Sequence, residues 1–148
     1  MRPVLLLSLL LIAFYLHGTA VVADESDKPF AEAHIVLQVA DGDAETQTRA
    51  LSVANNLLKH YGGPDFVDIE IVAYGPGLSL LYPDNANRHR ISSLVSNAVR
   101  FAGCLNTVET IERTTGKKPE LIPATIPVQT GVARLVELAQ QGYVIIRP

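Results

Sequence analysis

The amino-acid sequence predicts a three-layer α/β/α domain with a mostly parallel sheet of about five strands. Segments rich in β-branched residues alternate along the chain with segments whose apolar residues recur every three or four positions. The first pattern is typical of strands covered on both faces, and the second is typical of amphipathic helices. Strands that alternate with helices build a parallel sheet with helices on both faces, because each helix crosses over the sheet to start the next strand.

The N-terminal segment 1–23 differs from the rest of the chain and is expected to be a secretory signal peptide. Arg2 precedes an apolar run from Val4 to Leu16, and small residues follow up to Ala23, where we place the cleavage. The run is shorter than the about 20 apolar residues of a membrane-spanning helix, so membrane association is expected only through an uncleaved signal segment. We therefore expect a periplasmic or secreted protein, with a flexible segment at 24–32 and one domain at 33–148.

Four segments are rich in β-branched and other apolar residues and are bounded by turn residues, which predicts strands. In chain order, these strands are expected at 34–40, 67–73, 99–102 and 143–146. The second strand alternates before it becomes wholly apolar, so Asp68 and Glu70 are expected at a solvent-exposed end. The segment 119–127 contains three prolines and is expected to hold at most a short edge strand at 121–122.

Four other segments carry apolar residues at helical spacing. In chain order, helices are expected at 45–61, 87–97, 107–115 and 131–141, with one further helical turn at 78–81. Three of the helices are followed by a glycine, which is the common residue just after a helix end. Thr107 is expected to cap the third helix through its hydroxyl. The buried side of the last helix is expected to consist of Val132, Leu135, Val136 and Ala139.

Composition and motifs disfavour several classes of function. The formal net charge is −3 without a long run of like charges, so nucleic-acid binding is not expected. Histidines are few and form no pair at metal-ligand spacing, so no metal site is expected. The chain also lacks the Gly-x-Ser-x-Gly elbow of serine hydrolases and the glycine patterns of nucleotide-binding loops. We expect no cofactor.

The candidate site lies where the predicted strands end. Ligands of parallel sheets bind outside the carboxyl ends of the strands, and three loops of this chain meet there. One of them contains Cys104, the single cysteine, at a helix start where the helix dipole favours a thiolate. A buried structural cysteine is the alternative. The amides of Gly75 and Gly77 could approach an anion, and Asn56 could reach the same crevice, although a tight turn and a solvent-facing amide explain these residues equally well.

The segment 99–107 resembles the signature of the DsrE/DsrF-like sulfur-relay family, in which a strand delivers a cysteine followed by Asn and Thr at a helix start. Here these residues are Cys104, Asn106 and Thr107. The segments 55–58, 67–77 and 142–148 resemble, in the same order, the family's first helix, its second strand with a glycine loop, and its closing strand. The resemblance spans roughly 34–148.

The resemblance implies a parallel-sheet α/β/α protomer that assembles into a homo-oligomer, as a trimer or hexamer. It also implies that sulfur is carried as a persulfide on Cys104, with a small sulfur species or a partner thiol protein as the reaction partner. The expected export signal departs from the cytoplasmic relay members and puts their cytoplasmic partners in doubt.

Two functional hypotheses follow. In the first, the chain is a sulfurtransferase-like carrier whose Cys104 thiolate accepts sulfane sulfur and passes it to another thiol. In the second, it is a noncatalytic oligomeric module that binds a small ligand or a partner, and Cys104 is structural.

Overall fold

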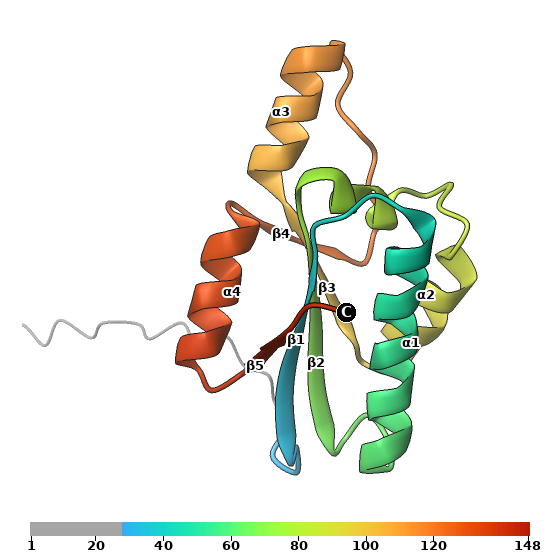
Figure 1. Cartoon of the computed structure of the whole chain (residues 1–148), viewed down its shortest axis with the longest axis vertical. Coiled ribbons are helices and arrows are strands. Elements are labelled where there is room, and N and C mark those ends of the chain that lie inside the picture. The colour runs from blue at the N-terminus through green and yellow to red at the C-terminus, as the bar shows by residue number, and fades with distance from the viewer. Residues whose placement is uncertain (1–27) are drawn as a thin grey trace, which may run out of the picture.

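The computed structural model describes residues 28–148, and its sheet and helices have the predicted three-layer arrangement (Figure 1). All strand pairs are parallel, in the order β4-β3-β2-β1-β5. The strands are β1 (Ala33–Val39), β2 (Val67–Ala73), β3 (Arg100–Cys104), β4 (Thr125–Val128) and β5 (Val144–Ile146). The helices are α1 (Ala44–Tyr61), the 3-10 helix η1 (Gly75–Leu81), α2 (Arg88–Ser96), α3 (Leu105–Thr115) and α4 (Gly131–Gln140).

The helices divide unequally over the sheet. In Figure 1, α1 and α2 cover one face, α4 covers the other, and α3 projects beyond the edge where the strands end. The larger apolar core lies on the α1 side and includes Leu37, Ile71 and Phe101, which are fully buried. A smaller core on the α4 side contains Val36, Val72, Ala102, Leu135, Leu138 and Tyr143. The carboxyl edge, from which α3 projects, therefore lies between two unequal faces: one covered by α1 and α2 with the larger core, and one covered by α4 with the smaller core.

The longest helix shows how local sequence sets the element bounds. Asp43 caps α1, and its carboxylate accepts a hydrogen bond from the Thr46 amide at 2.8 Å. The helix thus begins slightly before the expected residue 45. It ends as expected at Tyr61, because Gly62 adopts the left-handed conformation with φ of 86°.

The third helix begins earlier than predicted. Cys104 is its N-cap residue and Leu105 its first residue, so the expectation that Thr107 caps the helix is wrong. The Thr107 hydroxyl lies inside the first turn and makes other contacts, described below.

The edge strand is also displaced from its expected position. β4 runs over Thr125–Val128 instead of 121–122, and it contains Pro127. A proline is tolerated there because an edge strand has only one neighbour to which its amides can donate. Leu121 and Ile122 instead pack against the larger core, and the Ile122 amide donates to the Leu81 carbonyl.

The expected buried side of the last helix is only partly correct. Leu135 is buried as expected, but Val132 and Val136 are 52% and 51% exposed, and Leu138 is fully buried instead. The helix is rotated so that Arg134 faces the sheet, where it pairs with Glu70. The prediction missed this rotation because a charged residue was not expected to face the core.

The expected solvent-exposed start of the second strand is wrong as well. Every residue of β2 is buried, and both Asp68 and Glu70 have no exposed surface. Their charges are compensated by neighbouring cationic side chains, which allows carboxylates to occupy a buried face.

The predicted signal peptide at 1–23 lies outside the described residues. Of the segment 24–32 that was expected to be flexible, the structure describes residues 28–32, which include a turn attached to the sheet. The Lys28 ammonium donates to the carbonyls of Val67 and Ala98, each at 3.1 Å, and the Glu32 amide donates to the Phe66 carbonyl. Within residues 28–148, no helix is both long and apolar enough to cross a bilayer.

Candidate functional site

Cys104 is the last residue of β3 and the N-cap of α3, at the carboxyl edge of the sheet. It is 4% exposed, so the sulfur lies just beneath the surface. Cys104 immediately precedes α3 in the chain. It also pairs with Val128 at the end of β4, and α4 begins three residues after Val128, so the start of α4 lies close to Cys104. The thiol sulfur lies 3.8 Å from the carbonyl oxygen of Gln129, to which the neutral thiol donates.

The surroundings of the sulfur make the Cys104 thiol easier to ionise than an ordinary cysteine thiol. Burial alone raises the pKa of the Cys104 thiol. The Thr107 hydroxyl and the amides of Gly131, Thr107 and Asn106 lower it more, so the pKa of Cys104 lies below its ordinary value, although the first-turn amides of α3 make no cap hydrogen bond to the neutral thiol. The donors come from the first turns of two helices, whose amides suit an anion, and the Asn106 amide is shared with the Gln129 carbonyl, to which it donates at 3.1 Å.

Thr107 is held in place by the glycine loop. Its hydroxyl oxygen accepts a hydrogen bond from the Gly75 amide at 2.9 Å. Since one lone pair is used in this way, the hydroxyl proton remains free to point at the Cys104 sulfur. Gly75 therefore acts on the thiol indirectly, by orienting a donor.

Gly131 brings the second helix start to the sulfur. A Cβ at this position would lie 2.9 Å from Cβ of Tyr74 and 3.0 Å from its ring, so only glycine allows α4 to approach this closely. Asn106 ties the same two helices together. Its side-chain amide donates to the Thr130 hydroxyl at 3.0 Å, and its carbonyl oxygen accepts from Gln129 Nε2 at 2.7 Å.

Several predicted site residues have other roles in the structure. The Gly77 amide donates to the carbonyls of Ala40 and Tyr74, and the Gly75 amide donates to Thr107, so neither amide is available to an anion. Gly77 is required for packing, because a Cβ there would lie 2.3 Å from the Val39 carbonyl oxygen. Asn56 is solvent-exposed on α1 and does not reach the carboxyl edge. Among the predicted binding residues, only Asn106 and Thr107 contribute to the surroundings of the sulfur.

A cavity of about 500 Å³ adjoins the site. It lies between α3 and the glycine loop and is lined by Gly75, Pro76, Tyr82, Asn106, Thr107, Thr110 and Ile111. It shares Asn106 and Thr107 with the sulfur's surroundings, although Cys104 itself does not line it. Among the described residues, no group of His, Cys, Asp and Glu side chains could hold a metal ion.

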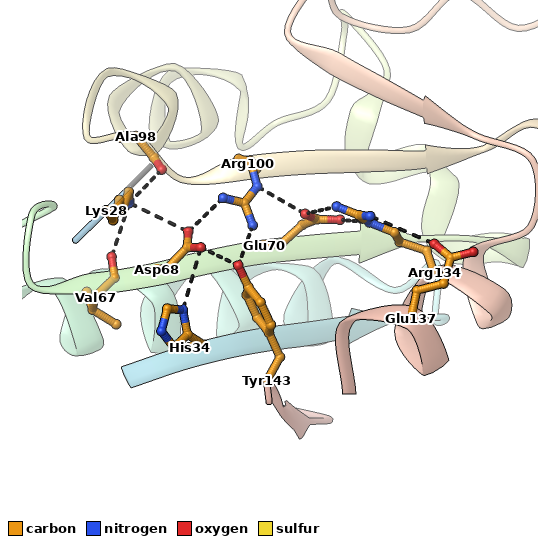
Figure 2. Close-up of polar contacts among 10 residues, drawn as sticks. All are labelled: Lys28, His34, Val67, Asp68, Glu70, Ala98, Arg100, Arg134, Glu137 and Tyr143. Atoms are coloured by element: carbon orange, nitrogen blue, oxygen red, sulfur yellow. Dashed lines mark hydrogen bonds and ion pairs between the residues drawn. The ribbon is translucent and has the colours of Figure 1, made fainter. Parts of the chain in front are cut away.

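Sequence reasoning missed a buried charged network on the α4 face of the sheet (Figure 2). Arg100 donates to Asp68 at 2.7 Å and to Glu70 at 3.0 Å, and Arg134 donates to Glu70 at 2.8 and 2.9 Å. The Tyr143 hydroxyl joins the network by bonding to Asp68 and Arg100. One signal was available, because Asp68 and Glu70 alternate within an apolar strand and must share one face.

These features define a parallel α/β/α domain with its single cysteine at the carboxyl edge of the sheet. No protein-family model and no curated protein matches the chain. The chain is similar to the solved structure of a protein of unknown function, MTH1491 from Methanobacterium thermoautotrophicum, with 28% sequence identity and a TM-score of 0.69. That match covers 79% of this chain and 100% of MTH1491, so the likeness extends over most of the described fold.

Proposed function

We propose that the chain is an exported DsrE/DsrF-like protein that carries sulfane sulfur as a persulfide on Cys104. The resemblance of the segment 99–107 to that family supports the proposal. The main structural observation behind the proposal is that hydrogen-bond donors surround the Cys104 sulfur and lower its pKa; the Thr107 hydroxyl and the Gly131 amide are among them. A thiolate is the nucleophile in sulfur transfer, so a lowered thiol pKa suits this reaction.

The proposed chemistry is a substitution at sulfur. The Cys104 thiolate attacks the outer sulfur of thiosulfate, a sulfur–sulfur bond forms to Cys104, and the sulfur–sulfur bond of thiosulfate breaks with release of sulfite. The total charge is unchanged, and no external oxidant or reductant is needed. A second thiolate, from a small molecule or a partner protein, then attacks the outer sulfur of the persulfide and regenerates Cys104.

The second candidate function is a noncatalytic binding module in which Cys104 is structural. The 4% exposure of Cys104 favours this second function, because a free cysteine commonly packs in the interior as a small apolar side chain. The cavity beside Asn106 and Thr107 would then hold a small ligand that does not react with the thiol. The two candidates differ in whether sulfur becomes covalently bound.

Intact mass after incubation with polysulfide or thiosulfate tests the proposal. We expect the protein to gain the mass of one sulfur atom and to lose it on treatment with a reducing thiol. The Cys104→Ser variant is the matched control, because Cys104 is the only cysteine of the chain and the variant should gain nothing. A wild-type protein that gains no mass with either donor, or a gain that persists in Cys104→Ser, would contradict the proposal and favour the binding module.

A further inference from the structure

Glu70 connects the two elements that meet at the Cys104 sulfur. It is fully buried in the middle of β2, on the face covered by α4 (Figure 2). Its carboxylate accepts from Arg100 Nε at 3.0 Å and from Nε and an Nη of Arg134 at 2.8 and 2.9 Å. Arg100 begins the strand that ends in Cys104, and Arg134 lies one turn after Gly131 on α4.

Apart from Gly131, which packs against Tyr74, the first turn of α4 has no buried apolar residue. Val132 is 52% exposed, and the first buried apolar side chain of the helix is Leu135. The Arg134 side chain, by contrast, is only 11% exposed. Hydrogen bonds between ionised groups are stronger than neutral ones, and those from Arg134 end on a fully buried carboxylate. They are therefore a principal attachment of this turn to the sheet.

A second attachment exists at the surface. Asn106 bonds to Thr130 and Gln129, just before α4 begins. These bonds are exposed and neutral, and water competes for them, so each contributes less than a buried charged bond. The Glu70 pair fixes the helix from beneath, where water does not replace it.

We propose that Glu70, through Arg134, positions the amino end of α4 against the Cys104 sulfur and thereby makes the thiol easier to ionise. Glu70 is a positioning residue, since it acts on the sulfur through Arg134 and Gly131. The proposal concerns the ionisation of the thiol and stands whether or not sulfur is the substrate.

The direction in which the pKa of Cys104 moves when Glu70 loses its charge distinguishes a positioning role from a purely electrostatic one. The charged or titratable groups between α4 and the sheet are Asp68 and Glu70 on β2, Arg100 on β3, Arg134 and Glu137 on α4, and Tyr143 after α4. Removing the negative charge of Glu70, which pairs with Arg100 at the other end of β3, would through Coulomb interaction alone make the thiolate slightly more stable. Loss of positioning predicts the opposite, because the Gly131 amide would no longer be held against the sulfur.

The test is a pH titration of the thiolate ultraviolet absorbance, recorded as a difference from the Cys104→Ser protein. This readout works for a buried thiol and needs no reagent to reach it. For Glu70→Gln we expect the thiol ionisation constant to fall about tenfold, which moves the midpoint about one pH unit upward. Arg134→Lys keeps the positive charge but loses the planar fork, so a smaller change in the same direction is expected. Arg147→Gln, which removes an exposed ion pair with Asp41, should leave the midpoint unchanged.

A midpoint that stays constant or falls in folded Glu70→Gln would overturn the proposal. Folding is checked by circular dichroism, since removal of a buried charge can destabilise the protein. If Glu70→Gln does not fold, Arg134→Lys decides alone, and an unchanged midpoint in that variant overturns the proposal. Failure of this test would leave the sulfur-carrier proposal standing, because mass gain on Cys104 is measured independently.

Discussion

At the level of single residues, the state of Cys104 depends on a balance between burial and hydrogen bonding. Cys104 is 4% exposed, and the resulting loss of contact with water disfavours the charged form of its thiol. Donors compensate for this loss, and Thr107 is the one side chain among them. Because Thr107 also accepts from the Gly75 amide, its hydroxyl links the glycine loop to the thiol.

Thr107→Val should therefore weaken the site without changing its shape much. Valine lacks the hydroxyl, so we expect the pKa of Cys104 to move upward, toward its ordinary value. The Gly75 amide would also lose its acceptor, with a loss of stability of about 1–3 kcal/mol. The pH dependence of the thiolate absorbance and urea unfolding measure the two effects. Thr110→Val, one turn later and exposed, is the control, and equal behaviour of the two variants would contradict the assigned role of Thr107.

At the level of elements, α4 is the thin layer of the fold and holds one half of the site. Its contact with the sheet combines a small apolar core, to which Leu135 and Leu138 belong, with the ion pair between Arg134 and Glu70. The opposite side of the helix exposes Val132 and Val136. The stability of this layer therefore depends on few side chains.

Truncations on the two sides of α4 should differ strongly. Leu138 is fully buried, so Leu138→Ala is expected to lower the free energy of unfolding by about 2–5 kcal/mol. Val136 is 51% exposed on the same helix, so Val136→Ala should change it by less than about 0.5 kcal/mol. Urea unfolding of both variants measures the difference. A cost for Val136→Ala as large as that for Leu138→Ala would mean that the helix face is assigned incorrectly.

For the whole molecule, the parallel topology explains why the site forms at this edge. Each strand ends at the same edge, so β3 delivers Cys104 beside the loop that follows β2. β4 pairs with β3 and leads into α4, which brings a second helix start to the same point. Two helix amino ends thus meet at one sulfur as a consequence of strand order.

Much of this architecture could be predicted from the sequence, because strands and helices differ in the spacing of their apolar residues. Cys104, Asn106 and Thr107 were also predictable, since they are neighbours in the chain. Gly131 was not, because it reaches the sulfur only through tertiary packing. Asp68 and Glu70 were assigned to a solvent-exposed end because carboxylates are rarely buried without partners, and their partners Arg100 and Arg134 lie far away in sequence.

Sulfur transfer by this protein requires that the folded chain hold Cys104 partly ionised despite its burial. The most direct measurement is the midpoint of the thiolate absorbance titration for the wild-type protein, with Cys104→Ser as baseline. We predict a midpoint below the ordinary pKa of a cysteine thiol, so that the thiolate fraction at neutral pH exceeds that of a free cysteine. A midpoint at or above the ordinary value would show that burial outweighs the donors, and it would contradict the account.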